Sequence, residues 1–158
     1  MGLRGVNRVM IAVRDLEAAK QRYTQLLGAT FEDAHWTGAP FGIAVSIAWD
    51  AGIELCAPLP GREQTSAVSP YLEKHGEGVM SVFFGVDDVD AAQGRAAEAG
   101  VGSIHALDYT QQEIDSHLGG KFSRYQEAVL NTSGELGVGV CLARIDPKDD
   151  GGSDWPSC

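Results

Sequence analysis

The pattern of apolar and polar residues in the first part of the chain predicts a strand followed by a helix. A short apolar run over 9–13 predicts a buried strand. Apolar residues then recur at helical spacing between Leu16 and Leu27, with Asp15 before them and Gly28 after them. Asp favours the N-cap of a helix and Gly its C-terminal end, so we expect a helix between these two residues.

Strands complete this first module, which we place over 1–60. Runs typical of strands cover 30–32, 41–49 and 53–56. The turn residues Asp50-Ala51-Gly52 separate the last two runs, which indicates a hairpin. The module therefore has the order βαβββ.

A second module, over 79–145, repeats this order. Residues 7–19 align without a gap on 80–92, and 52–55 match 139–142. The predicted elements are a strand over 79–86, a helix over 88–99, and strands over 103–106, 122–130 and 136–143. A repeat indicates two copies of one supersecondary unit, whose equivalent positions are expected to converge on a shared site. These positions are Arg8, Glu54, Ser81 and Cys141.

Three segments lie outside the repeated pattern. A polar linker over 61–78 contains a short helix that Ser69-Pro70 begins, because Pro suits the first helical position. An insertion over 108–120 interrupts the second module and contains a second short helix. The acidic, Gly-rich end over 146–158 lacks apolar periodicity, so we expect a flexible tail. The fold class that follows is α+β.

Charge and cysteine usage narrow the possible partners and compartment. The net charge of −10 disfavours nucleic acid and anionic membranes as partners. No stretch is apolar for the roughly 18 residues that a membrane span needs, and no signal peptide is evident. The three cysteines have no metal-binding or redox spacing, which is typical of a reducing cytoplasm. We expect a cytoplasmic protein whose partner is a small molecule.

Several motifs, taken in their order along the chain, resemble those of the vicinal oxygen chelate superfamily. They are Val13-Arg14-Asp15-Leu16-Glu17-Ala18-Ala19, Leu26-Leu27-Gly28, Tyr71-Leu72-Glu73-Lys74-His75-Gly76-Glu77-Gly78 and Val86-Asp87-Asp88-Val89. The superfamily includes glyoxalase I, extradiol dioxygenases, bleomycin-resistance proteins and methylmalonyl-CoA epimerase, and the resemblance over about 5–145 is greatest to the epimerase branch. It implies a curled, open sheet in which the two modules enclose a cleft. It also implies a homodimer.

Metal enzymes of this superfamily take one ligand from each of four strands, typically His, a carboxylate or Gln, His and Glu. Carried over by the resemblance, these ligands fall on Arg8, Glu54, Ser81 and Cys141. Arginine donates hydrogen bonds only and stays cationic, so it cannot bind a metal ion. Serine is a poor ligand, and Cys with Glu but without His is not a usual set. We therefore predict no metal and no other cofactor.

Arg8 and Glu54 have two possible roles. They could form a buried ion pair that fills the space of the lost metal, because burying either charge alone is costly. Alternatively, Arg8 binds a carboxylate, enolate or phenolate oxygen of a ligand and stabilises its negative charge, while Glu54 acts as general base. The two roles are compatible if the pair opens when ligand arrives.

Further candidate ligand-binding residues are Ser81, Cys141, Tyr109, Tyr125 and His75. Ser81 and Cys141 also suit a small packed residue, and His75 suits a solvated position at a helix end. The two tyrosines belong to the insertion and the strand after it, where a lid over the cleft is expected.

Three classes of function compete. The first is a metal-independent isomerase or lyase that transfers a proton on a small carbonyl or carboxylate compound. The second is a non-catalytic binding protein of the bleomycin-resistance type, whose acidic surface would suit a cationic drug. The third is a metalloenzyme with rearranged ligands, such as Glu54 and Cys141 with a distant histidine. Whether the chain is an enzyme stays open at this point.

Overall fold

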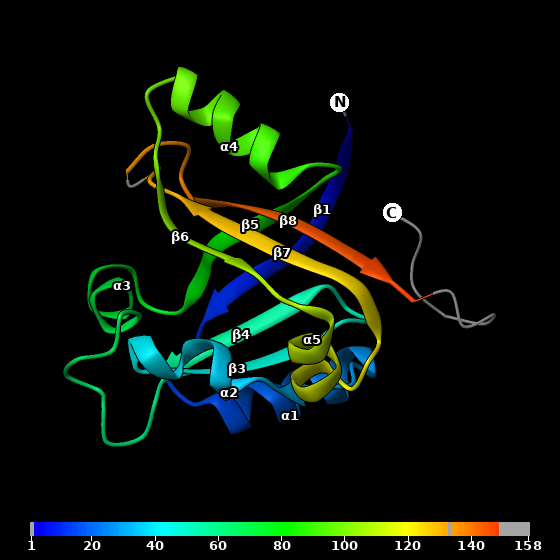
Figure 1. Ribbon diagram of the computed structural model, residues 1–158. Helices are drawn as coiled ribbons and strands as arrows, with labels where there is room; N and C mark the ends of the chain where they lie inside the picture. The colour runs from blue at the N-terminus through cyan, green and yellow to red at the C-terminus, as the bar shows by residue number, and fades with distance from the viewer. Residues whose placement is uncertain (1, 133, 149–158) are drawn as a thin grey trace. The chain divides into compact units, whose positions relative to one another are not determined.

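The computed structural model describes residues 2–132 and 134–148, and it contains both helices and strands, as expected for the α+β class (Figure 1). The chain forms two compact units. The N-terminal unit is Arg8–Ser81, and the C-terminal unit is Met1–Asn7 with Val82–Cys158. Strands β1 (Leu3–Ala12) and β5 (Gly78–Val86) each contribute residues to both units.

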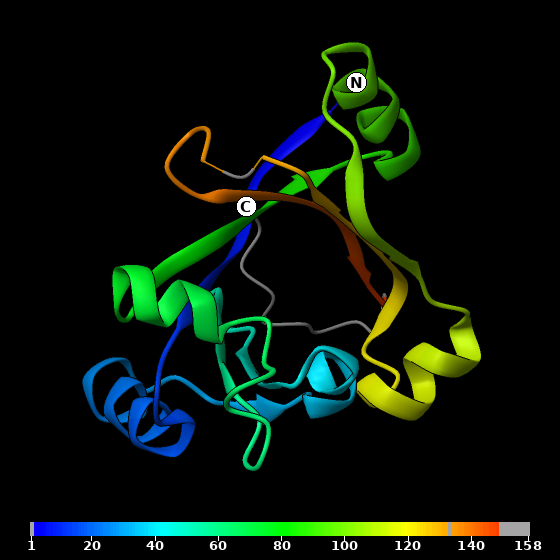
Figure 2. The ribbon, with the colours of Figure 1, turned by 90° about the vertical axis from the view of Figure 1, so that its left-hand side faces the viewer.

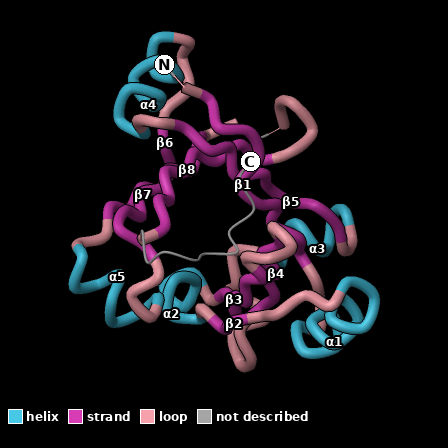
Figure 3. The backbone as a smooth tube through the Cα atoms, turned by 90° about the vertical axis from the view of Figure 1, so that its right-hand side faces the viewer, coloured by secondary structure: helices cyan, strands magenta, loops and turns pink. Residues whose placement is uncertain are grey.

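Helices and strands of the N-terminal unit follow the predicted order. After β1 come α1 (Leu16–Leu27), β2 (Glu32–Asp33), α2 (His35–Gly38), the 3-10 helix η1 (Ala39–Phe41), β3 (Ile43–Ala48), β4 (Ile53–Pro58) and α3 (Ser69–His75). The strands lie in the order β2-β3-β4-β1. β3 is antiparallel to both β2 and β4, whereas β1 is parallel to β4. Figure 3 shows α1 and α2 separated by these strands.

Local capping accounts for the first helix. The Asp15 side chain accepts a hydrogen bond from the backbone N–H of Ala18, and Gly28 adopts a left-handed conformation with φ of 71°. Both predicted ends are confirmed. The strand predicted from residue 41 instead begins at Ile43, because Phe41 ends a 3-10 turn and Gly42 has a φ of 69°.

The C-terminal unit repeats the arrangement of the N-terminal unit. After β5 come α4 (Val89–Glu98), β6 (Ser103–Asp108), α5 (Gln111–Leu118), β7 (Phe122–Leu130) and β8 (Gly139–Pro147). Its strands lie in the order β5-β8-β7-β6, which corresponds strand for strand to β1-β4-β3-β2. The predicted pair of βαβββ modules is therefore confirmed. Figure 2 shows β6 running between α4 and α5.

The last strand differs from its prediction at both ends. Leu136, the expected first residue, is 78% exposed and has a φ of 57°, which a strand residue does not adopt. The strand continues to Pro147, so Asp146 is part of β8 and not of a tail. The rest of the tail predicted over 146–158, from residue 149 on, lies outside the described residues. The helix predicted over 88–99 ends at Glu98, the next residue Ala99 is exposed, and Val101 packs against the core.

The helix after the first strand of each unit packs against one face of the sheet. In the N-terminal unit, α1 packs on the face that carries Ile53, Leu55 and Ala57. In the C-terminal unit, α4 packs on the face that carries Ala128, Leu130 and Leu142. Side chains alternate between the two faces of a strand, so the residues between these positions point to the opposite faces. Among the described residues, none of the helices is long and apolar enough to cross a membrane.

Candidate functional site

Arg8 and Glu54 form a buried ion pair in the N-terminal unit. β1 and β4 run parallel, with Met10 opposite Glu54, so Arg8, two residues before Met10, lies on the same face as Glu54. The Arg8 Nε donates to the Glu54 Oε2 across 2.6 Å, and the two side chains are 2% and 6% exposed. The first of the two roles considered for these residues, a buried ion pair, is thus present in the structure.

The strand register explains why these charged side chains are inside the protein. Their neighbours Val9 and Ile53 pack on the face covered by α1, so Arg8 and Glu54 point to the other face. Because removing either partner would leave a buried, uncompensated charge, the two residues depend on each other.

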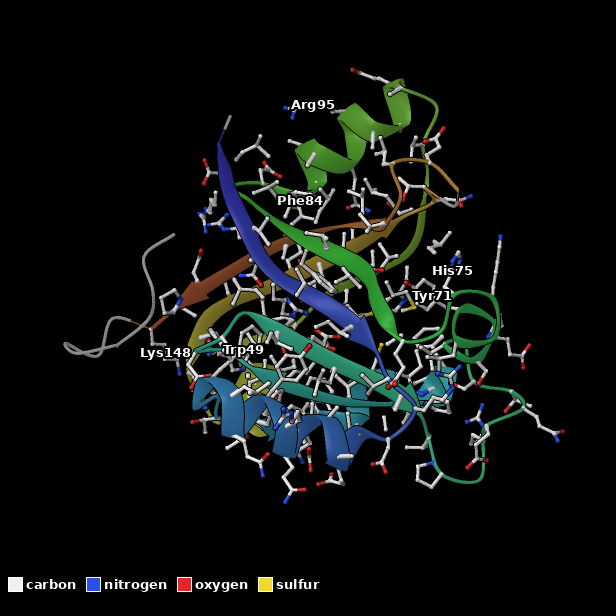
Figure 4. The ribbon with its side chains drawn as sticks, turned by 180° about the vertical axis from the view of Figure 1, so that it is seen from behind. Trp49, Tyr71, His75, Phe84, Arg95 and Lys148 are labelled. Carbon is white, nitrogen blue, oxygen red and sulfur yellow. The ribbon has the colours of Figure 1, made fainter. Side chains whose placement is uncertain are left out.

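The indole of Trp49 provides a second contact for the Arg8 guanidinium. The Arg8 Cζ lies 5.3 Å from the centroid of the Trp49 ring, within the range of a cation–π interaction. Trp49 follows β3, where Ile47 lies opposite Glu54. The position of Trp49 at this end of the strand is visible in Figure 4. A carboxylate and an aromatic ring therefore both hold the guanidinium.

Cys56 lies two residues beyond Glu54 on the same face of β4. Burial raises the pKa of the Cys56 thiol, and the negative charge of Glu54 raises it further. Its Sγ donates to the backbone carbonyl of Ile11 across 3.5 Å. The thiol therefore stays protonated at neutral pH and is a packed group, not a nucleophile.

The structure places the other two repeat-equivalent residues on different units. Ser81, 9% exposed, is the last residue of the N-terminal unit and lies on β5. Cys141, 1% exposed, lies on β8 of the C-terminal unit, opposite Val129 of β7. Both are small and buried.

The remaining candidates belong to two aromatic groups. His75, at the end of α3, is exposed and packs at a tilt against Tyr71 with the ring centroids 4.8 Å apart (Figure 4). In the C-terminal unit, Tyr125 is buried, with Tyr109 stacked on it at 5.4 Å and Phe122 edge-on at 5.9 Å. Tyr109 is only half-buried, so it is the more accessible of the two tyrosines.

Glu127 on β7 was missed by the sequence reasoning. It is 8% exposed, although glutamate is rarely buried. Its neighbour Ala128 packs on the face covered by α4, so Glu127 points to the other face. The alternation within Phe122–Leu130 was a usable signal, because it sets Glu127 on the same face as Tyr125 and Val129. The repeat drew attention to Cys141 instead, since that residue is equivalent to Glu54.

These residues do not fit a divalent metal ion of the kind that the resemblance implies. Arg8 occupies the position of the first ligand with a permanently charged donor, and it already binds the carboxylate of the second, Glu54. Within residues 2–132 and 134–148, no three His, Cys, Asp or Glu side chains are grouped as a metal site. Arg8, not a metal ion, is therefore the positive group paired with Glu54 in this structure.

Comparison with known proteins identifies clear relatives. The family model described as the Glyoxalase/Bleomycin resistance protein/Dioxygenase superfamily matches residues 7–116. An ethylmalonyl-CoA/methylmalonyl-CoA epimerase of Cereibacter sphaeroides is 36% identical over 120 residues, which is 71% of this chain and 81% of that protein.

Solved structures of methylmalonyl-CoA epimerases share the fold. The enzyme from Mycobacterium tuberculosis has a TM-score of 0.66 at 24% identity, and the match covers 92% of this chain and 89% of that one. A methylmalonyl-CoA epimerase in complex with methylmalonyl-CoA and NH4+ has a TM-score of 0.67 at 23% identity, over 92% of this chain and 100% of that one.

Proposed function

Because the chain belongs to the Glyoxalase/Bleomycin resistance protein/Dioxygenase superfamily, we propose that it is a metal-independent isomerase of the epimerase type. It would move a proton at the carbon next to the carbonyl group of a small carboxylate compound. The relatives named above act as epimerases of ethylmalonyl-CoA and methylmalonyl-CoA, which makes a 2-carboxyacyl thioester the first substrate to test.

The buried Arg8–Glu54 pair is the observation that carries this proposal. An enolate that forms during proton removal needs a positive group near its oxygen. Arg8 supplies a fixed positive charge inside the protein, held by Glu54 at 2.6 Å and by the Trp49 ring. The planar guanidinium matches a carboxylate or enolate oxygen. Arg8 would thus do the electrostatic work that a divalent ion does in metal-dependent relatives.

Glu54 would be the base. Paired with Arg8, its carboxylate is held in the charged form but is a weak proton acceptor. When a substrate oxygen binds the Arg8 guanidinium in place of Glu54, the carboxylate of Glu54 loses its ion-pair partner and becomes a stronger base. The C–H bond next to the carbonyl then breaks, its proton goes to Glu54, and its electron pair moves to the carbonyl oxygen beside Arg8. Reprotonation of the same carbon completes the isomerisation.

The other expected contacts belong to the same proposal. We propose Ser81, Cys141, Tyr109, Tyr125 and His75 as further ligand-binding residues. We also propose a cytoplasmic homodimer whose partner is a small molecule, with no metal or other cofactor.

The same ion pair also favours an alternative, a non-catalytic binding protein of the bleomycin-resistance type. A Glu54 that never leaves Arg8 cannot act as a base, and a closed pair would serve only to hold the protein together. The net charge of −10 would then attract a cationic ligand.

A hydrogen-exchange assay separates the two functions. The purified protein is incubated with methylmalonyl-CoA in D2O, and deuterium at the carbon between the two carbonyl groups is followed by NMR. We expect the wild type to exchange and invert this carbon, and Glu54→Gln to bind the thioester yet to turn over at least about 100-fold more slowly. Equal turnover by the variant would rule out Glu54 as the base.

Two further measurements complete this test. Elemental analysis of the active protein should find no stoichiometric zinc, iron, manganese or cobalt, and chelator should leave the exchange rate unchanged. A wild type that binds ligands but neither exchanges nor inverts any 2-carboxyacyl thioester would support the alternative function.

A further inference from the structure

Trp49 contacts Arg8 but has no role yet in the proposed reaction. The centroid of its ring lies 5.3 Å from the Arg8 Cζ, while the Glu54 Oε2 accepts from the Arg8 Nε across 2.6 Å. The proposed reaction needs Arg8 and Glu54 to separate, yet a buried charge that loses its partner is costly. A second group on the guanidinium lowers this cost when Glu54 leaves.

The indole of Trp49 is held in place by β3 and by the turn after it. Trp49 is half-buried and packs against a buried apolar cluster of Ala34, Val45 and Ile47. The carboxylate of the next residue, Asp50, accepts the backbone N–H of Thr30, with its two oxygens at 3.2 and 3.1 Å. The ring therefore keeps its position when the Arg8–Glu54 pair opens.

The internal repeat indicates that packing alone does not require a ring at this position. The alignment that matches 52–55 with 139–142 also matches Trp49 with Leu136. Leu136 is 78% exposed and has a φ of 57°. The C-terminal unit thus forms the same strand order without a packed ring at the equivalent position. We therefore looked for a role of Trp49 beyond packing.

An indole can hold a cation without neutralising it. The faces of the ring carry partial negative charge and attract a guanidinium, most strongly where water is excluded. A second carboxylate would also hold Arg8, but it would cancel the positive charge that an enolate oxygen needs. Trp49 is neutral, so the charge of Arg8 remains available to the substrate.

We propose that Trp49 is a positioning residue of the isomerisation, a role that rests on the proposed function. Its indole keeps the Arg8 guanidinium in place while a substrate oxygen replaces the Glu54 carboxylate. Glu54 is then able to act as the base, and Arg8 stays where the negative charge of the enolate forms. The indole takes no part in the proton transfer itself, because it acts through Arg8.

Fluorinated tryptophans at position 49 test this role. Fluorine atoms on the indole withdraw electrons from the ring faces and change the shape of the ring little. With methylmalonyl-CoA in D2O, we expect the exchange rate to fall with each added fluorine, by about 10-fold for three. Trp49→Leu should lower the rate at least as far, and Trp49→Phe less, since Phe keeps an aromatic face. A rate that does not depend on fluorine would show that Trp49 only packs.

Phe31→Leu provides the matched control. Phe31 is an aromatic residue of the same unit, but it packs on the face covered by α1, with its ring centroid 6.5 Å from that of Tyr23. We expect lower stability and an unchanged exchange rate. If Phe31→Leu slows exchange as much as Trp49→Leu does, the loss is not specific to the ring on Arg8, and the proposal fails.

A measurement of stability tests the contact without any turnover. Trp49→Leu is made in the wild type and in a variant that combines Arg8→Met with Glu54→Leu. If the indole holds the cation, Trp49→Leu should lower the folding equilibrium constant about 10-fold more in the wild type than in the uncharged variant. Equal decreases would overturn the proposal.

The two measurements together separate this proposal from the proposed function. A larger decrease in the wild type, combined with a rate that ignores fluorine, would show that the indole holds Arg8 only in the resting protein, and the proposal would fail. A wild type that neither exchanges nor inverts the thioester, with the larger decrease still present, would instead count against the proposed function.

Discussion

The two units have the same strand order, yet the arginine ion pairs of the two units differ in burial. In the N-terminal unit, Arg8 is 2% exposed and meets Glu54 inside the protein. In the C-terminal unit, Arg4 and Arg144 share Asp146 near the surface, with Arg4 38% exposed. Surface ion pairs contribute little stability because water and salt screen them, whereas a buried pair cannot lose one partner without a large cost.

This difference shows what a repeat can and cannot conserve. Helix caps and strand order depend on short-range rules, so both units retain them. The sheet faces opposite α1 and α4 carry the buried polar groups, and there the units differ. The N-terminal unit has a cation bound to a carboxylate, and the C-terminal unit has a carboxylate with a thiol, Cys141.

The strongest test of this comparison is removal of the buried arginine. Arg8→Ala leaves the Glu54 carboxylate buried without its guanidinium, so we expect the free energy of unfolding to fall by roughly 3–5 kcal/mol. Urea denaturation followed by circular dichroism measures this change. The loss should persist at high salt, because the pair is buried.

The control replaces both partners. Arg8→Met combined with Glu54→Leu removes both charges and fills the space with apolar groups, so most of the lost stability should return. If Arg8→Ala costs less than about 1 kcal/mol, as a surface pair would, the contrast between the two units has no energetic basis.

The sequence predicted those features that neighbouring residues determine. Asp15 and Gly28 gave the ends of α1 correctly, because each acts on its own helix terminus. The repeat led to Arg8 and Glu54, and the cost of burying either charge alone led to the possibility that they pair. The α+β class and the two modules followed from the same pattern.

Two predicted strand ends were wrong because an apolar residue there lies in a turn and not in a strand. Phe41 lies in a 3-10 turn beside Pro40, and Leu136 lies in a turn with positive φ, so their apolar character did not place them in strands. Glu127 was missed because its burial depends on which face of β7 is covered. Neither the Trp49 contact with Arg8 nor that burial is determined by local sequence.

The helix N-caps, which the two units share, predict a smaller effect on stability. Asp15 and Asp88 are equivalent N-caps, and each side chain accepts a hydrogen bond from a backbone N–H three residues later. We expect Asp15→Ala and Asp88→Ala each to lower stability by about 1 kcal/mol. Thermal unfolding of the two variants measures this, and a difference of more than about 1 kcal/mol between them would contradict equal caps in the two units.

The smallest effect concerns the surface pair and depends on pH. Burial alone would raise the pKa of Asp146, but hydrogen bonds from Arg4 and Arg144 outweigh it and hold the pKa below its ordinary value of 3.8. A lowered pKa means that the ionised carboxylate stabilises the fold above that value, and that this contribution is lost as the pH falls through the lowered pKa.

Asp146→Asn should therefore lower stability by less than about 1 kcal/mol near neutral pH, because the partners are partly exposed. The difference from wild type should disappear in strong acid. Denaturation of both proteins across this pH range measures it, with the exposed Glu135→Gln as a control for net charge. A difference that stays constant down to acid would show that Asp146 acts through packing, and that the C-terminal unit does not owe this stability to charge.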